Sequence, residues 1–292
     1  MRNKTGIVPK FNVFDVMMYA AVGLFALATF YPLIYVLAGS LSDARELMYG
    51  PAFLFPRNFN INSYRVLLSD SRLFRAAWNT ISSMVVTVVV HLFVTSGVAY
   101  ALASKRLKGR KIFWFFNIVT MFISGGLIPF YIVILQTGLF NTFWVYIVPA
   151  VYSVFNMIIL SNFFRNLDDE MYESAVMDGA GEYRIWLQIF VPLAKPAIAT
   201  VALWVAVSRW NAFMPTLLFT DRSEGIWLLQ FYLMRLIRHE QLPPDRGANF
   251  EMISAQTLSF AAIIITSVPI LILFPFVTRF FTKGIMLGSI KG

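Results

Sequence analysis

The sequence contains no cysteine, and only 13% of its residues are charged. The first absence excludes disulfide bonds and thiolate chemistry, and it fits either side of a membrane. The charged fraction is well below the roughly 25% that is typical of soluble domains. Because 58% of the residues are hydrophobic and the mean hydropathy is +0.68, we predict an integral membrane protein.

Motifs of the common nucleotide and metal enzymes are also missing. The chain has neither the GxxxxGK[ST] loop that binds ATP phosphates nor the HExxH zinc motif. A membrane-embedded enzyme would need paired catalytic groups inside its apolar segments, and an ion-coupled carrier usually has carboxylates there. Asp15, near a segment end, is the only such acid. We therefore expect no enzymatic activity, no metal, no cofactor bound by this chain, and an energy source outside it.

Long apolar segments are what the sequence does contain. They are nearly free of charge and about as long as a membrane is thick, which predicts helices rather than the shorter alternating strands of a barrel. The expected spans are residues 13–38, 79–103, 112–136, 143–164, 194–219 and 256–282. We therefore predict an all-α fold with six transmembrane helices in a single domain, 1–292. Gly125-Gly126 before Pro129 predicts a weakened third span.

The distribution of positive charge predicts which side faces the cytoplasm. The loop SKRLKGRK at 104–111 is the densest basic cluster, and the positive-inside bias explains the net charge of +9 without nucleic acid. This places the 165–195 segment, between the fourth and fifth spans, on the cytoplasmic side. The N-terminal segment 1–12 and the tail 283–292 are expected there too, so both termini are cytoplasmic.

The 165–195 segment is polar between two apolar segments. The acids that follow Asn166 predict a helix start ahead of MYESAVM. Gly179 and Gly181 predict a break, after which EYRIWLQIF restarts the helix. Pro192 marks the approach to the fifth span. The residues expected to share one apolar face of the second helix are Tyr183, Trp186, Leu187 and Phe190. That face would be buried against lipid headgroups or in a partner's groove.

This segment carries a recognisable signature, Glu-x-Ala-x-x-Asp-Gly-Ala followed by Ile-x-x-Pro. It resembles the EAA signature of permease subunits of bacterial ATP-driven importers, with Ser174 and Val191 in place of the usual Ala and Leu. The matching residues are Glu173, Ala175, Asp178, Gly179, Ala180, Ile189 and Pro192. The resemblance covers nearly the whole chain and looks like a carbohydrate-type permease of the maltose-transporter class. The stretch 209–237 is similar to a subgroup linked to oligo- and polysaccharide uptake.

The resemblance implies a set of partners in the bacterial cytoplasmic membrane. They are a second, related permease, two cytoplasmic ATPase subunits that bind ATP and magnesium, an extracytoplasmic solute-binding protein and membrane lipid. The chain would then move a carbohydrate inward, and the tail 284–292 would enter the interface between the ATPases. A permease for a non-sugar solute and an ion-coupled secondary carrier are the alternatives. The residues leave the identity of the sugar open.

The resemblance also implies roles for the signature residues. Glu173 would offer a carboxylate to an arginine of the ATPase, which is a charge-assisted bond. Gly179 would permit the bend, and the two signature alanines would keep the packed face thin. Tyr183 and Trp186 would fill a hydrophobic socket on the ATPase. A surface loop that only anchors two spans at the headgroups is the competing interpretation.

Arg209-Trp210-Asn211 in the fifth span form the candidate substrate pathway. An arginine inside a membrane is costly unless it faces a cavity or a partner. Trp210 would stack on a sugar ring and Asn211 would bond hydroxyls; alternatively, Arg209 pairs with the second permease. His91, in the second span, is interpreted as a hydrogen-bonded packing residue. Three further amides would line a polar path or bridge helices: Asn117, Asn156 and Asn162.

Overall fold

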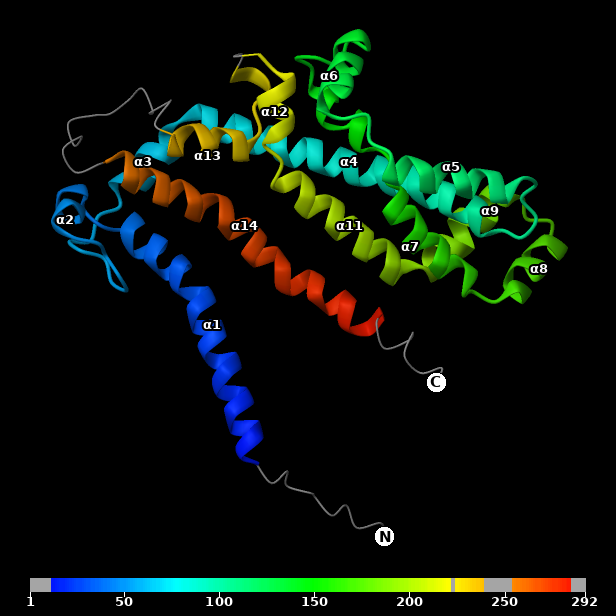
Figure 1. Ribbon diagram of the computed structural model, residues 1–292, viewed down its shortest axis with the longest axis horizontal. Helices are drawn as coiled ribbons and strands as arrows, with labels where there is room; N and C mark the ends of the chain where they lie inside the picture. The colour runs from blue at the N-terminus through cyan, green and yellow to red at the C-terminus, as the bar shows by residue number, and fades with distance from the viewer. Residues whose placement is uncertain (1–11, 222–223, 239–253, 285–292) are drawn as a thin grey trace. The chain divides into compact units, whose positions relative to one another are not determined.

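The computed structural model describes residues 12–221, 224–238 and 254–284, with side chains of the last stretch described up to Ile272 (Figure 1). These residues form helices and turns, and the one β contact among them is an isolated bridge between Ser42 and Phe59. The predicted all-α class is confirmed for this part of the chain. The N-terminal segment 1–12, except for its last residue, and the tail from 285 onward lie outside the described residues.

The chain forms two compact units, one made of residues 1–67 and 242–264 and the other of 68–241 and 265–292. The first unit contains α1 (Val13–Ser40), α2 (Ala44–Tyr49), most of α3 (Asn62–Ser69) and the start of α14 (Ala255–Gly284). Its α1–α14 contact depends on Gly39, where a Cβ atom would lie 2.5 Å from the Phe260 ring. Only glycine allows that approach.

Three helices are long and apolar enough to cross a membrane singly, namely α1, α4 (Ser71–Ala103) and residues 255–272 of α14. They confirm the expected spans at 13–38 and 79–103, and α14 extends without a break over the expected sixth span at 256–282. The helix α4 begins earlier than expected because the side chain of Asp70 accepts a hydrogen bond from the backbone of Arg72 and caps the helix.

The other expected spans are broken. In the third, α5 (Arg110–Phe122) and α6 (Leu127–Gln136) meet at 111°, and in the fourth, residues 143–150 meet α7 (Val154–Arg165) at 46°. Residues 182–193 likewise meet α11 (Lys195–Trp210) at 83°. The described residues therefore give three spans, or up to six if each bent pair counts as one. The predicted weakness in the third span is confirmed as a complete break.

The breaks in the third and fourth expected spans have local causes. Gly126 has a φ of 85°, a backbone conformation that favours glycine, and it interrupts the third span. Ser153 caps α7 by accepting a hydrogen bond from Asn156, which starts that helix anew. The expectation of one fifth helix over 194–219 was wrong, because α11 ends at Trp210 and α12 (Met214–Phe219) starts with a proline in its first turn. Pro215 has no backbone N–H with which to continue the hydrogen bonding of α11.

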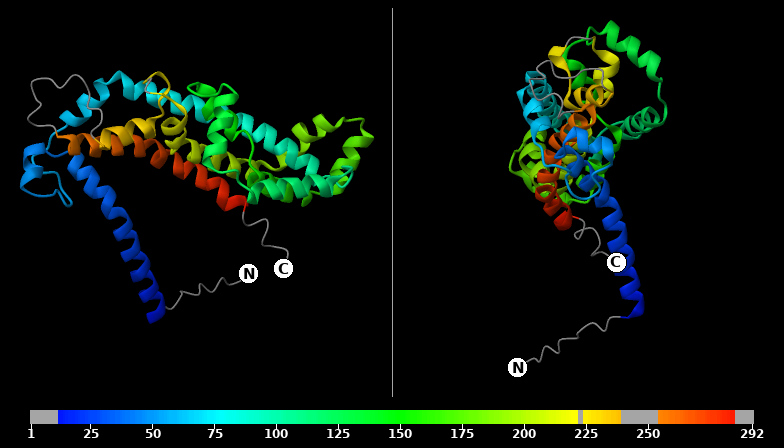
Figure 2. Two further views of the ribbon diagram at one scale, coloured as in Figure 1. Left: turned by 45° about the horizontal axis from the view of Figure 1, so that its top comes forward. Right: turned by 90° about the vertical axis from the view of Figure 1, so that its left-hand side faces the viewer.

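The core of the second unit lies where α4 packs against α7 and α11 (Figures 1 and 2). The best-buried apolar residues of this contact are Ala99, Leu102, Met157, Leu160, Phe164 and Val201. The same helix also holds α13 (Leu229–Ile237), because the hydroxyl of Thr80 accepts a hydrogen bond from the backbone of Leu229 at 2.8 Å, and the amide of Asn79 donates to Gly225 and Trp227 just before it. The helix α4 is thus the common support of this unit.

His91 bridges two neighbours inside this core. Its Nδ1 lies 2.7 Å from the carbonyl oxygen of Ala150 and its Nε2 lies 2.9 Å from the amide nitrogen of Asn156. Because a carbonyl only accepts, Nδ1 carries the proton and Nε2 accepts from the amide. This confirms the interpretation of His91 as a hydrogen-bonded packing residue.

We predict that His91→Leu lowers the stability of the chain by about 2 kcal/mol, because it leaves the buried amide of Asn156 and the half-buried carbonyl of Ala150 without partners. The matched control is Thr95→Val, one turn along the same helix. The Thr95 hydroxyl is buried without a hydrogen-bond partner, so its removal is expected to be neutral or stabilising. Thermal unfolding of both variants, followed by size-exclusion chromatography in detergent, tests this. Equal losses in the two variants would contradict the bridging role.

Candidate functional site

The predicted helix, break and second helix of the 165–195 segment are confirmed. Asp168 caps α8 (Asp169–Met177) by accepting from the backbone of Glu170 at 3.2 Å. The helix ends at Met177, and Gly179, two residues further on, has a φ of 74°. The backbone of Ala180 donates to Ala175, a closing bond typical of a helix that ends in a left-handed glycine. The chain re-enters a helix as α9 (Glu182–Ile185).

The apolar face expected on the second helix is not formed as predicted. Tyr183 and Leu187 are exposed, whereas Ile185, Trp186 and Phe190 are buried. The reason is local, because α9 continues as a π-helical turn, η3 (Trp186–Phe190), before α10 (Val191–Leu193). A π-helix pairs residues five apart, so the spacing of an ordinary helix does not hold. The predicted face is therefore split between core and solvent.

Trp186 in particular turns into this chain. Its ring lies 5.2 Å from that of Phe93, measured between centroids. A Cβ atom at Gly97 of α4 would lie 3.2 Å from the Trp186 ring, so the glycine makes room for it. The expected insertion of Trp186 into a partner's socket is not available in this conformation. Tyr183, which is 79% exposed, remains free to make such a contact.

A single carboxylate ties the segment together. Glu182 accepts a hydrogen bond from Tyr100 at the end of α4, at 2.6 Å, and another from Tyr172 of α8, at 2.5 Å. The bond to this carboxylate raises the pKa of the Tyr172 phenol. These three residues, which we call the Glu182 clamp, join α8, α9 and α4 across the glycine turn. Sequence reasoning missed them because no spacing connects position 100 with position 182.

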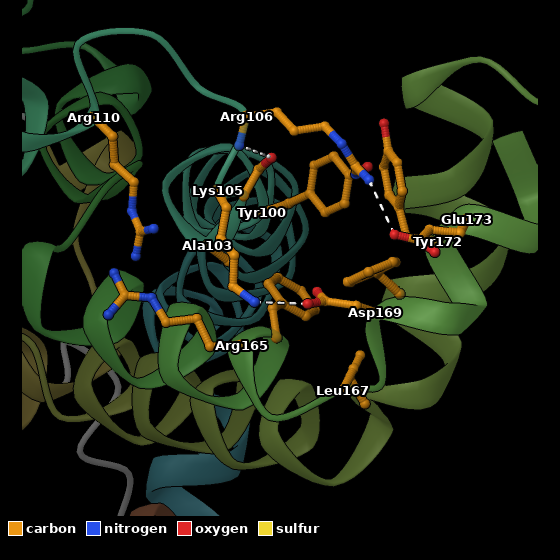
Figure 3. Close-up of a pocket in the computed structure, with 13 residues that line it drawn as sticks. Tyr100, Ala103, Lys105, Arg106, Arg110, Arg165, Leu167, Asp169, Tyr172 and Glu173 are labelled. Carbon is orange, nitrogen blue, oxygen red and sulfur yellow. Dashed lines mark hydrogen bonds and ion pairs between the residues drawn. The ribbon is translucent and has the colours of Figure 1, made fainter.

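The basic loop at 104–111 holds α8 from the other side (Figure 3). Lys105 pairs with Asp169 at 2.6 Å and keeps the pKa of that carboxyl below its usual value. The guanidinium of Arg106 lies 3.8 Å from the centroid of the Tyr172 ring and 3.8 Å from a carboxylate oxygen of Glu173. Glu173, predicted to meet a partner's arginine, thus already has an arginine of its own chain nearby. Its side chain remains 67% exposed.

A cavity of about 280 Å³ lies between this loop and the ends of α4, α7 and α8. Tyr100 and Tyr172 of the clamp line it, together with Arg106 and Arg165. Because Asp169 and Glu173 line it as well, its wall combines charges of both signs with aromatic rings. Among the described residues, no group of three or more metal-ligating side chains is found here or elsewhere.

The signature residues divide between the inner and outer sides of the segment. Ala175 is buried and belongs to the core, and Ala180 and Ile189 are half-buried. Asp178, Gly179 and Pro192 are exposed. The outer side also exposes large apolar side chains, namely Met171, Val176, Met177, Tyr183 and Leu187. Apolar side chains gathered on a polar segment are typical of a protein contact.

Each of the three substrate-pathway candidates bonds to a backbone carbonyl of this chain. Trp210 is 6% exposed and donates its indole N–H to the carbonyl of Thr266 in α14 at 3.2 Å. Its ring presents no face to a sugar in this conformation. Arg209 donates to the carbonyl of Tyr146 at 3.4 Å, and the exposed Asn211 bonds to Val207 of its own helix. The three residues therefore lie at the C-terminal end of α11.

The remaining predicted amides have different surroundings. Asn156 bonds to His91 as described, and Asn117 of α5 accepts from the hydroxyl of Tyr152, just before α7. Both amides therefore bridge segments, which is one of the two roles expected of them. Asn162 is exposed on α7.

Comparison with known proteins gives matches over nearly the full chain. The family model described as "binding-protein-dependent transport system inner membrane component" matches residues 96–286. Protein LplC of Bacillus subtilis (strain 168) is 37% identical over 96% of both chains. The polygalacturonan/rhamnogalacturonan transport system permease protein YtcP of the same strain is 34% identical over 97% of this chain and 100% of that protein.

The fold also has close counterparts among solved structures. A chain in the crystal structure of a bacterial ABC transporter involved in the import of the acidic polysaccharide alginate has a TM-score of 0.87 and 31% identity. The match covers 94% of this chain and 99% of that chain. A chain in a bacterial alginate ABC transporter complexed with an alginate pentasaccharide-bound periplasmic protein has a TM-score of 0.62. At 16% identity, that match supports the fold alone.

We predict that Glu182→Ala opens the Glu182 clamp. Two hydrogen bonds to a carboxylate are lost, at about 1 kcal/mol each, so backbone amides within 171–185 should exchange with deuterium about tenfold faster or more. The control is Glu170→Ala, which removes the same charge from an exposed position in the first turn of α8. Hydrogen-exchange mass spectrometry of the full chain in detergent measures both variants. Unchanged exchange in Glu182→Ala would show that the clamp does not hold the segment.

Proposed function

The chain belongs to the family of binding-protein-dependent transport system inner membrane components, and on that premise we propose that it is the permease subunit of an ATP-driven carbohydrate importer. The observation that carries this proposal is the match, in sequence and fold and over nearly the full length, to a chain of an alginate importer. Permeases of this family are translocation subunits, and the chain would supply the path while other subunits supply the energy.

We propose six membrane crossings, three of which are bent pairs. Non-helical backbone at membrane depth is tolerated only where protein or a water-filled path satisfies its polar groups. The breaks after α5 and before α7 would therefore face the path or a neighbouring subunit. The surface of α1 also favours a neighbouring subunit. Large apolar side chains along this helix are exposed, among them Leu24, Phe25 and Leu27. Lipid and a second, related permease would cover them, with both termini in the cytoplasm.

We propose that the segment from α8 to α9 docks on a cytoplasmic ATPase subunit, one of two that bind ATP and magnesium. Exposed Met177 and Tyr183 would fill the apolar part of the contact, and Glu173 would exchange Arg106 for an arginine of the ATPase. The Glu182 clamp supports a coupling role. A displacement of α8 acts through it on α4, which contacts both α7 and α11.

The proposed cargo is an oligo- or polysaccharide delivered by an extracytoplasmic binding protein. The relatives support this class, since one is named for polygalacturonan and rhamnogalacturonan and others for arabino-oligosaccharides and diacetylchitobiose. The solved importer carries the acidic polysaccharide alginate. Because Trp210 is buried, recognition would rest mainly on the binding protein and the second permease. Arg209 and Asn211 would contribute only polar contacts at the end of α11.

The proposal predicts sugar-dependent ATP hydrolysis in the assembled transporter. The complex, reconstituted with its binding protein, is supplied with oligogalacturonides, alginate, arabino-oligosaccharides and chito-oligosaccharides in turn. We expect one class to stimulate ATP hydrolysis severalfold and to accumulate inside vesicles. Uptake that needs no ATP but collapses with the proton gradient would favour an ion-coupled carrier. Stimulation by amino acids or peptides alone would favour a non-sugar permease.

Docking further predicts that Gly179→Val uncouples the transporter. Valine at a φ of 74° costs about 1–3 kcal/mol, which would distort the turn between α8 and α9. Binding-protein-stimulated ATP hydrolysis should fall about tenfold while the protein stays in the membrane. Gly181→Val is the control, because Gly181 has an extended backbone (φ −74°, ψ 160°) and open space around its Cα. Equal activity of the two variants would contradict the role assigned to the turn.

A further inference from the structure

A second groove, of about 1020 Å³, lies beside the cavity described above. Four basic side chains line it, and its lining contains no acidic residue; the four are Lys105, Arg110, Lys111 and Arg165. Lys105 is paired with Asp169. Within the part of the chain that the structure describes, none of the other three takes part in an ion pair. The groove therefore holds a surplus of positive charge.

Two arginines from different helices face each other here. Arg110 begins α5 and Arg165 ends α7, and Figure 3 shows their guanidinium groups pointing toward one another. Arg165 also lies over the Trp114 ring, 4.6 Å from its centroid. Like charges held this close repel, and cations in the first turn of a helix, such as Arg110 and Lys111, also oppose the helix dipole. An anion between the two guanidinium groups would relieve both costs.

The wall that continues from these charges is apolar. Ile112, Phe115 and Ile118 of α5 line the groove and are exposed. Because α5 is the first half of a candidate span and α7 the last half of another, the arginines lie where apolar segments meet water. A free phosphate would use the charges only, whereas a phospholipid would use the charges and the wall together.

We propose that this groove binds an anionic phospholipid, with the headgroup phosphate between Arg110 and Arg165 and an acyl chain along Phe115 and Ile118. Arginine pairs suit a phosphate because each guanidinium can donate two parallel hydrogen bonds. Basic pockets between helices on the cytoplasmic side are a recurrent setting for anionic headgroups. The bound lipid would also steady the loop at 104–111, which holds α8 through Lys105 and Arg106.

Trp114 provides a reporter inside the groove. The full chain is placed in mixed micelles with phosphatidylglycerol or phosphatidylcholine whose acyl chains carry bromine, which quenches tryptophan fluorescence on contact. The difference between the unaltered chain and Trp114→Phe isolates this ring from the other six tryptophans. We expect brominated phosphatidylglycerol to occupy the site about fivefold more readily, or better, than phosphatidylcholine, given the contribution of a basic residue near an anionic lipid.

Substitutions in the groove test which residues cause the preference for phosphatidylglycerol. Arg110→Gln with Arg165→Gln should reduce it to less than about twofold, whereas Lys108→Gln should leave it intact. Lys108 lies in the same loop and carries the same charge, but it lines neither cavity. Lysine at both arginine positions should preserve part of the preference. If the double variant does not fold, Arg110→Gln alone and the comparison of the two lipids on the unaltered chain still test the proposal.

Other results would overturn the proposal. Equal quenching of Trp114 by the two lipids would show that the groove has no preference for an anionic headgroup. An equal loss in Lys108→Gln would show only a general effect of charge. Loss of the signal on addition of glycerol 3-phosphate at constant ionic strength would identify a site for a soluble phosphate rather than for lipid. Because no ATPase or sugar is needed, failure here leaves the proposed transport function untouched.

Discussion

The packing of α4 against α7 and α11 is the interaction on which the rest of the second unit depends. Lipid surrounds a membrane helix with hydrocarbon, so helices associate there through close packing and internal hydrogen bonds rather than through the hydrophobic effect. The buried residues of α4 fit this requirement, because many of them are small or polar, such as Ser83, Thr87 and Ala99. His91, on the same helix, adds a bridge to Ala150 and Asn156. A force applied at one end of α4 would then move the helix together with its packed neighbours.

That end is where the 165–195 segment is attached. The Glu182 clamp and the basic loop hold α8 from two directions, and Trp186 anchors the following turn beside Gly97. These contacts are mostly polar and partly solvent-exposed, so each is worth little on its own. Together they attach the segment to α4 and leave its outer apolar side chains uncovered. A coupling element needs both properties, since it must follow a partner and still belong to the membrane part.

Sequence reasoning succeeded where the cause is local and failed where it is tertiary. The all-α class, the spans at 13–38 and 79–103, the helix start after Asn166 and the break at Gly179 all follow from composition, capping residues and glycine. The inward turn of Trp186 depends on a π-helical turn and on space at Gly97, which no periodicity reveals. The burial of Trp210 depends on α14, far away in the sequence. Because the resemblance to a permease rests on short spacings, it located the segment without revealing what holds it.

The basic loop at 104–111 makes more contacts than the positive-inside rule requires. Orientation needs only positive charge, which Lys108 supplies without touching either cavity. Lys105 and Arg106 face α8 and pair with its carboxylates, whereas Arg110, with Arg165, faces the groove along α5. The loop thus lies between the segment that would meet the ATPase and the groove that would meet lipid. Because Lys105 and Arg110 belong to the same short loop and line both cavities, the bilayer and the energy-supplying subunits would act on α4 through one connection.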